Sequence, residues 1–225
     1  MSLLVPQPNV VAAFEQLVRR RRATPHFTGE EVPAPVIEAA LQLAAEAPSG
    51  YNLQPWRFVV VQDPEVRSRL RQAAFDQEKI TEAPVVVVAC AEHDAWQERM
   101  DEIFRTRARQ SGRADEDMTK PRKQALDFIA TLPREVWLNR HVMIGFTYLM
   151  LAFEALGWDT APMEGFNAAA VRTVVGLPDN SAVVALLAVG RAAGTEPPHP
   201  GRLGVTEIAY GDRFGEPLHA ATLAR

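Results

Sequence analysis

The longest apolar stretch of the chain, from Val142 to Trp158, constrains the fold more than any other segment. A membrane span needs roughly 20 apolar residues, and this stretch is slightly shorter and contains Thr147 and Glu154. Arg140 and His141 lie just before it. We therefore predict a helix that is buried inside a folded protein. Because its side chains are apolar on nearly every face, this helix needs cover from several directions, and a second subunit is one way to provide it.

The composition is that of a soluble globular protein with one domain. The chain has 225 residues, of which 47% are hydrophobic and 23% are charged, so it can form one substantial core. Its formal net charge of -4 argues against a nucleic-acid partner, which would need a basic surface. The first residues lack the pattern of a secretion signal, and we therefore expect a cytoplasmic protein.

Cys90 is the only cysteine, so it cannot form a disulfide within the chain. It lies in the apolar run Pro84–Ala91, where we expect a buried strand residue, with a reactive thiol as the minor alternative. No cysteine pair or His-x-x-x-His spacing indicates a metal site, since the histidines are scattered. A glycine-rich dinucleotide fingerprint and a serine in a nucleophile elbow are also absent from the sequence.

Hydrophobic periodicity predicts helices and strands that alternate along one domain, residues 1–225, of the α+β class. Helices are expected at 10–22, 33–47, from Asp63-Pro64 onward, 142–158 and 167–175. Strands are expected at 57–62, 84–91 and 182–190. The strand at 84–91 is apolar enough to be buried. Residues 194–201 are rich in proline and indicate an extended linker into a C-terminal arm.

Residues 92–136 differ from the rest of the chain, because apolar residues thin out and charges alternate. Ser111-Gly112-Arg113 interrupts any continuous helix there. One interpretation is a solvated helical excursion with ion pairs four residues apart, such as Asp101 with Arg105. The other is a lid over a binding site. The sequence leaves both open.

The loop Pro48–Trp56 combines turn formers with amides and carries no net charge. Pro48 ends the preceding helix, and Gly50 lets the backbone come close to a bound group. Ser49, Asn52 and Gln54 offer donors and acceptors without a strong field. A capped helix followed by a surface turn would explain the proline and the glycine only. The loop is therefore predicted to hold a flat, polar ligand.

This loop resembles the Pro-Ser-x-x-Asn-x-Gln-Pro-Trp element of the nitroreductase family of FMN flavoenzymes. Four further segments are similar to the family in the same order, namely Arg20–Phe27, Asp76–Pro84, Pro162–Phe166 and Pro200–Leu203. The resemblance implies an α+β fold with a mixed central sheet flanked by helices. It also implies a homodimer with FMN at the subunit interface, an extended C-terminal arm, and the 142–158 helix at that interface.

By the same resemblance, Arg21 would bind the FMN phosphate, and Arg202 would be a second phosphate-binding cation. A guanidinium suits a phosphate because its planar fork makes parallel charge-assisted hydrogen bonds. Arg22 and Ala23 would meet the ribityl and pyrimidine side. The chain departs from the family at Ala23, where serine is usual, and at Pro25, where a cation is frequent.

The isoalloxazine ring would be contacted by three other segments. The family's pattern places Pro48, Ser49, Gly50 and Asn52 against the flavin of the partner subunit. It places the turn Pro162–Phe166 beside flavin N5 and O4, with Pro162, Glu164 and Gly165 as contacts. Lys79 would reach the N1 and O2 edge, where a cation stabilises the reduced ring. For Lys79, an exposed lysine at a helix end is the open alternative.

The resemblance implies an FMN-dependent oxidoreductase that transfers hydride from NADH or NADPH through flavin N5 by a ping-pong mechanism. The electron acceptor would be a nitroaromatic, a quinone or a related electron-poor small molecule, and no side chain need act as a nucleophile. The 92–136 excursion would then cover the flavin, with an apolar roof drawn from Trp96, Met100, Phe104, Phe128 and Trp137. The alternatives are a specialised enzyme of the same fold (deiodinase-like, flavin-destroying or dehydrogenase) and a flavin-binding protein without turnover.

Overall fold

The computed structural model describes residues 8–93, 95–195 and 198–218. Its centre is a sheet of four antiparallel strands in the order β1-β2-β4-β3. The strands are β1 (Trp56–Val61), β2 (Val85–Glu92), β3 (Asp159–Met163) and β4 (Ser181–Gly190). The parallel pairing expected of a mixed sheet occurs in the described residues only as an isolated bridge between Ala23 and Thr160.

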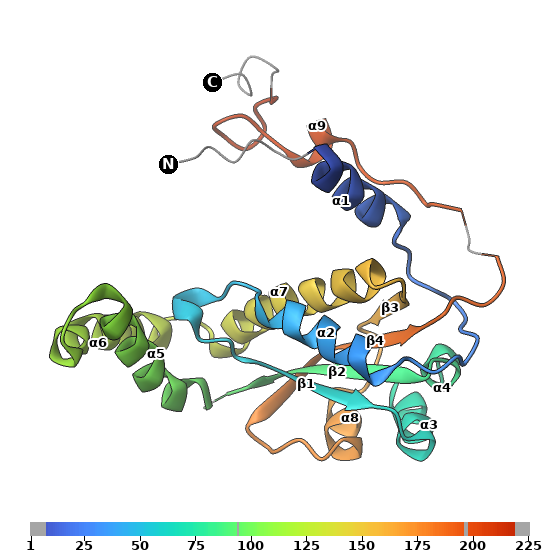
Figure 1. Cartoon of the computed structure of the whole chain (residues 1–225), viewed down its shortest axis with the longest axis horizontal. Helices are drawn as coiled ribbons and strands as arrows, with labels where there is room; N and C mark the ends of the chain where they lie inside the picture. The colour runs from blue at the N-terminus through green and yellow to red at the C-terminus, as the bar shows by residue number, and fades with distance from the viewer. Residues whose placement is uncertain (1–7, 94, 196–197, 219–225) are drawn as a thin grey trace.

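Helices cover both faces of the sheet (Figure 1). Long helices α2 (Ala34–Ala45) and α7 (Arg134–Ala155) lie on one face, and α3 (Pro64–Ala73), α4 (Lys79–Glu82) and α8 (Ala168–Val174) lie on the other. Alternate residues of β2 enter two separate cores: Val85 and Val87 face the first group, and Val86 and Val88 face the second. Burial on both faces explains why β2 is an unbroken apolar run.

Cys90 is buried in β2, as predicted. Its thiol donates a hydrogen bond to the Arg57 carbonyl at 3.3 Å. Desolvation by burial raises the pKa of Cys90 to about 11. Because a cysteine reacts as its thiolate, this thiol is inert near neutral pH.

Helix α7 begins eight residues earlier than expected, at Arg134 directly after Pro133. Its first turns are polar on one face, which hid them from the apolar pattern, yet Trp137 and Leu138 are buried. Gly145 lets Trp56 pack against the helix, since a Cβ there would lie 3.1 Å from the indole. Among the described residues, no helix combines the length and the hydropathy needed to cross a membrane.

The segment after β2 is helical and partly buried. It consists of α5 (Ala95–Ser111), a short 3-10 turn at Asp115–Met118, and α6 (Thr119–Ala130). Of the expected roof residues, Met100, Phe104 and Trp137 are buried in the core, whereas Phe128 is 53% exposed. The side chain of Trp96 lies outside the described residues. The buried side chains of this segment belong to the same core cluster as those of α2 and α7.

The prediction of an ion pair between Asp101 and Arg105 is wrong. Arg105 Nε donates to the backbone carbonyl of Asp101 at 3.3 Å. The Asp101 carboxylate instead forms an ion pair with Arg122 of α6. Spacing along one helix could not reveal this partner, because it comes from the neighbouring helix.

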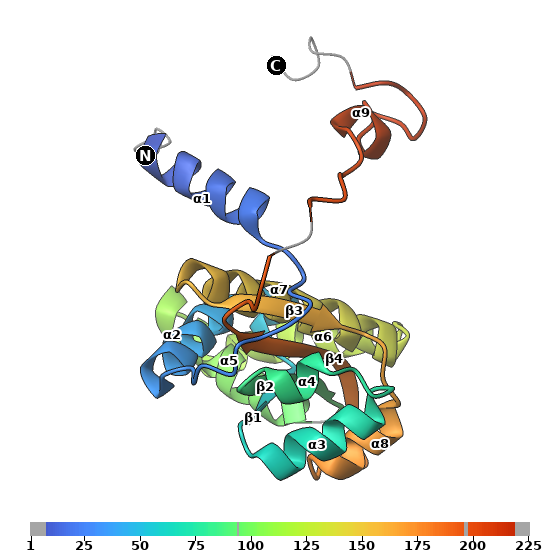
Figure 2. The same ribbon diagram turned by 90° about the vertical axis from the view of Figure 1, so that its right-hand side faces the viewer.

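Two segments project from the body of the molecule: helix α1 (Pro8–Arg20) and residues 198–218 with α9 (Val205–Ile208) (Figures 1 and 2). Both expose apolar side chains, namely Val10, Val11, Phe14 and Val18 on α1, and Leu203, Val205, Ile208 and Phe214 near the C-terminus. Contiguous exposed apolar surface of this kind is typical of an interaction site.

Candidate functional site

The loop between α2 and β1 has a strained backbone. Tyr51, Asn52 and Gln54 have φ values of 55°, 62° and 47°, a left-handed conformation that residues with a Cβ rarely adopt. The loop is fixed by two internal bonds: Gln54 N–H donates to Ser49 Oγ at 2.9 Å, and Gln54 Nε2 donates to Asn52 Oδ1 at 3.1 Å. Such strain, held in place by the surroundings, is concentrated at functional sites.

The structure gives Gly50 a steric role within the chain. A Cβ at this position would lie 3.1 Å from His141 Nε2 and 3.4 Å from the Trp137 ring. The glycine therefore lets the loop approach α7. His141 Nδ1 donates to the Trp137 carbonyl at 2.7 Å, which orients the imidazole toward the loop. His141 was one of the scattered histidines, and nothing in the sequence linked it to Gly50.

A second group of polar residues lies where α1 ends. Arg22 Nη1 donates to the carbonyls of Arg19, Arg20 and Arg21 at 2.6, 3.1 and 2.8 Å, so it ends the helix at Arg20 instead of the expected Arg22. By contrast, Arg21 Nη1 and Thr24 Oγ1 are buried without a hydrogen-bond partner. Buried donors of this kind ordinarily have partners. They favour a bound anion that completes the site.

The predicted second cation, Arg202, lies within electrostatic reach of this group. The pKa of His199 is lowered by desolvation and then by the charges of Arg22 and Arg202. The Arg202 guanidinium donates to the carbonyl of Gly201 at 2.6 Å. The charges of Arg22 and Arg202 therefore both act on the same imidazole, which is the link that the structure gives between these two segments.

Glu154 connects this group to the sheet. Glu154 is 3% exposed, and its Oε1 accepts hydrogen bonds from Thr160 N at 3.1 Å and Thr160 Oγ1 at 2.7 Å. Burial raises the pKa of Glu154 to about 7, although the Thr160 hydroxyl and the Arg21 charge act in the opposite direction. Thr160 O in turn accepts from Thr24 N at 3.0 Å. The sequence showed Glu154 only as a polar interruption of an apolar helix.

The third group joins α4 to the segment after β3. Gln77 Nε2 donates to the Gly165 carbonyl at 2.8 Å, so the residues before Lys79 lie beside Glu164 and Gly165. Lys79 is the first residue of α4 and is half-buried. No carboxylate of the described residues lies within 4.0 Å of its ammonium group. The structure therefore places the residues before Lys79 next to the segment after β3.

Pro162 is not part of a turn, as the motif suggested. It belongs to β3 and pairs with Leu187 of β4. The turn begins only after Met163, and Phe166 N donates to Glu164 O at 3.1 Å. Proline was tolerated in this strand because β3 lies at the edge of the sheet.

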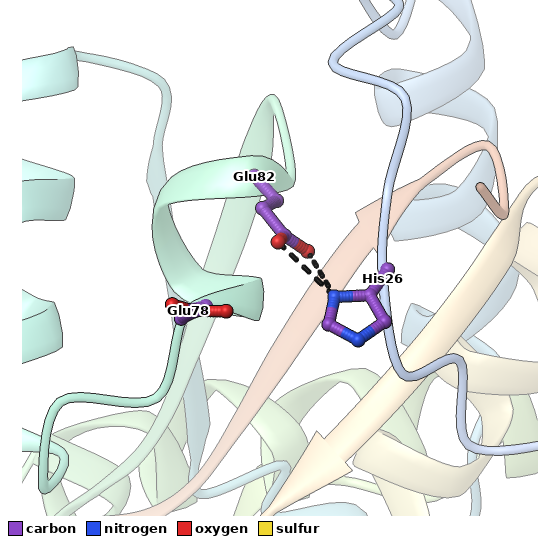
Figure 3. Close-up of side chains that lie close together, drawn as sticks. All are labelled: His26, Glu78 and Glu82. Carbon is purple, nitrogen blue, oxygen red and sulfur yellow. Dashed lines mark hydrogen bonds and ion pairs between the residues drawn. The ribbon is translucent and has the colours of Figure 1, made fainter. Parts of the chain in front are cut away.

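Figure 3 shows a further cluster, in which His26 faces Glu78 and Glu82 of the α4 region. His26 Nδ1 lies 3.1 Å from both oxygens of Glu82, and one of them also accepts from Phe27 N at 3.2 Å. Ligand atoms of the three side chains lie within 4.8 Å of one another. Glu78 is also 3.8 Å from Arg71. Through these contacts, His26 and Phe27 bind to Glu82 of α4, the helix that also contains Lys79.

The loop Pro48–Pro55 cannot share a site with these groups in one chain. It leads into Trp56, which pairs with Ala91 at the end of β2, whereas α4 leads into Val85 at its start. A strand rises about 3.3 Å per residue, so roughly 20 Å of sheet separates the two. Figure 1 shows α4 at the far end of the sheet from α5.

A model of the nitroreductase family matches residues 18–191 of this chain. The chain therefore belongs to the nitroreductase family, which confirms the resemblance and the class of oxidoreductase that it implied.

The relatives agree with this placement. An NADH dehydrogenase of Thermus thermophilus is 36% identical over 174 residues, which cover 77% of this chain and 84% of the relative. The structure of ydfN from Bacillus subtilis has a TM-score of 0.84 at 25% identity and covers 89% of this chain and 99% of its own. A structure from Exiguobacterium sibiricum 255-15 in complex with FMN has a TM-score of 0.77 at 24% identity, with 88% and 97% covered. The α+β class is thereby confirmed.

Proposed function

We propose that this protein is an FMN-dependent oxidoreductase that uses NADH or NADPH to reduce nitroaromatics, quinones or related electron-poor molecules. The observation that carries the proposal is the pair of buried, unpartnered donors, Arg21 Nη1 and Thr24 Oγ1. Arg202 adds support, because its charge acts on the same His199 imidazole as the charge of Arg22. A phosphate dianion would satisfy these donors and balance the cations. The names of the Thermus relative and of the FMN complex support the same chemistry.

In this proposal the chain's residues bind and orient the cofactor. Arg21 and Arg202 hold the phosphate, while Arg22 and Ala23 border the ribityl and pyrimidine side. The segment Pro162–Gly165 contacts the ring, with the backbone N–H groups of Glu164 and Gly165 near N5 and O4. When bound, FMN supplies hydride transfer at N5 by a ping-pong mechanism. No side chain is needed as a nucleophile, and the chain's part is positioning and electrostatic stabilisation.

The active protein is proposed to be a homodimer. Because the loop Pro48–Pro55 and the Arg21 group lie at opposite ends of β2, the loop can complete a site only in another copy. Pro48, Ser49, Gly50 and Asn52 would then meet the partner's flavin. Helix α7 keeps Ile144 and Tyr148 exposed one turn apart, and these side chains would be covered in the dimer. A cytoplasmic location, where NAD(P)H is available, is part of the proposal.

The test is an absorbance spectrum of the purified protein followed by anaerobic titration with NADH and with NADPH. We expect a yellow protein whose flavin band bleaches with at least one donor and returns when an acceptor is added. Light scattering of the same sample should give a dimer. A flavin that neither nicotinamide reduces would favour a binding protein without turnover, and a monomer that holds FMN tightly would contradict the shared site.

Lys79 is proposed to stabilise the charge that the ring gains on reduction. Replacing Lys79 by Ala should lower the midpoint potential of the bound flavin by about 30 mV, which corresponds to ~1.4 kcal/mol for a two-electron couple. Lys79→Arg should restore part of the potential. Dye-equilibrated titration measures both, with Lys123→Ala as the control because Lys123 pairs with Asp127 on the surface of α6. An unchanged potential in Lys79→Ala would make this residue a solvated helix-end lysine.

A further inference from the structure

A pocket of about 470 Å³ separates the strained loop from helix α5. The loop contributes Ser49, Tyr51 and Asn52, and the helix contributes Glu102, Ile103, Thr106, Arg107 and Gln110. Two of the loop residues, Ser49 and Asn52, are also proposed flavin contacts. The pocket therefore opens beside the place where the partner's ring would lie. A larger cavity of about 570 Å³ lies between α1 and the end of α7, away from this loop.

The helical wall of the pocket has an unbalanced positive charge. Its only carboxylate, Glu102, is neutralised by neighbours on α5: Arg109 Nη2 lies 3.2 Å away and Arg105 Nη2 lies 3.8 Å away. Thr106 Oγ1 also donates to it at 3.3 Å. Arg107 is different, because no carboxylate in the described parts of the chain lies within 4.0 Å of its guanidinium. The cation available to a ligand is thus Arg107.

The loop wall presents donors as well. Ser49 Oγ already accepts the Gln54 N–H, and Asn52 Oδ1 already accepts from Gln54 Nε2. The hydrogens of the Ser49 hydroxyl and of the Asn52 amide remain available. A pocket with these donors and a free guanidinium suits an oxygen-rich, negatively charged group better than an apolar or cationic one.

We propose that this pocket binds the electron acceptor and that Arg107 selects aromatic acceptors carrying a carboxylate. The inference rests on the proposed function. For a nitrobenzoate, NAD(P)H gives up a hydride and solvent gives a proton. Together they remove one nitro oxygen as water, which leaves the nitroso compound and NAD(P)+. The carboxylate takes no part in this exchange and serves only to orient the acceptor in the pocket.

The test compares charged and neutral ligands of the same shape in the FMN-loaded protein. Benzoate and benzamide, which cannot be reduced, are measured by equilibrium dialysis, and 4-nitrobenzoate and 4-nitrobenzamide by steady-state kinetics. We expect tighter binding of benzoate than of benzamide. Arg107→Gln should weaken benzoate binding and lower kcat/KM for 4-nitrobenzoate about tenfold, since a charge-assisted contact is lost. Both neutral compounds should change less than twofold.

Arg113→Gln is the matched control, because Arg113 is exposed just after α5 and does not line the pocket. It should leave all four values unchanged. Equal binding of benzoate and benzamide by the parent protein, or a preference that survives in Arg107→Gln, would overturn the inference. Reduction of both nitro compounds without discrimination would overturn it while leaving the proposed function intact. Conversely, Arg107-dependent binding of benzoate without any NAD(P)H oxidation would support the pocket and refute the proposed function.

Discussion

Replacing Glu154 by Gln is expected to flatten the pH dependence of stability between about pH 5 and pH 8. The pKa of this buried carboxyl is raised from 4.5 to about 7, chiefly by desolvation. Because the folded state favours the protonated carboxyl, the stabilisation is fully present below the pKa of the unfolded state. This stabilisation is lost as the pH rises through the pKa of the folded state, about 7. The parent should therefore lose on the order of 3 kcal/mol of unfolding free energy across that window.

In Glu154→Gln the side-chain oxygen can still accept the two hydrogen bonds from Thr160. No ionisation remains at this position, so the variant should be more stable than the parent at pH 8 and should lack the part of the pH dependence that comes from Glu154. Urea unfolding of the FMN-free protein at pH 5, 6.5 and 8 measures the difference. Glu116→Gln, an exposed carboxylate in the turn before α6, should keep the parent's slope. If stability falls with pH as steeply in Glu154→Gln as in the parent, the pKa of Glu154 does not differ between the folded and unfolded states.

Arg21→Ala should weaken FMN binding by about one to two decades. Removing one member of a charge-assisted contact costs roughly 1.5 to 3 kcal/mol. Arg21 Nη1 is buried without a partner, so a bound phosphate would be its natural acceptor. Riboflavin, which has the same ring and no phosphate, should bind the variant and the parent equally well. Fluorescence titration with both ligands measures this difference.

The control for Arg21 lies two residues earlier, in the last turn of α1. Arg19 is paired with Glu15 at 2.7 Å on the exposed surface, and Arg19→Ala should leave both affinities unchanged. Arg202→Ala should act in the same direction as Arg21→Ala. If Arg21→Ala weakens riboflavin and FMN alike, Arg21 supports the fold of the loop and the phosphate has been placed wrongly.

The elements with strong internal periodicity were predictable. Strand β2 reads as an uninterrupted apolar run because both of its faces are buried, and Cys90 follows from the same reasoning. Strand β3 was missed because it is short and contains Pro162, which an edge position tolerates. The start of α7 was missed for a similar reason, since its first turns are only half apolar.

The motifs predict site residues by position, whereas the contacts between distant segments are seen only in the fold. The motif assigned Arg21 and Arg22 by position alone, and it could not show that Arg21 has a buried unpartnered nitrogen while Arg22 bonds to carbonyls at the end of the helix. It also could not show that Gly50 lies against His141, which is 91 positions further along the chain. Glu154 and Thr160 form a link that only the packing of α7 against β3 creates.

The placement of the loop and of the Arg21 group at opposite ends of β2 has a genetic consequence. In the proposed dimer each flavin depends on segments encoded by two gene copies. A cell with one allele damaged at Asn52 and another damaged at Arg21 would still assemble mixed dimers. In each of these, one site receives both lesions and the other receives none. Two alleles that are inactive alone would therefore complement each other, and mutations in the two segments would not behave as equivalent losses of one gene.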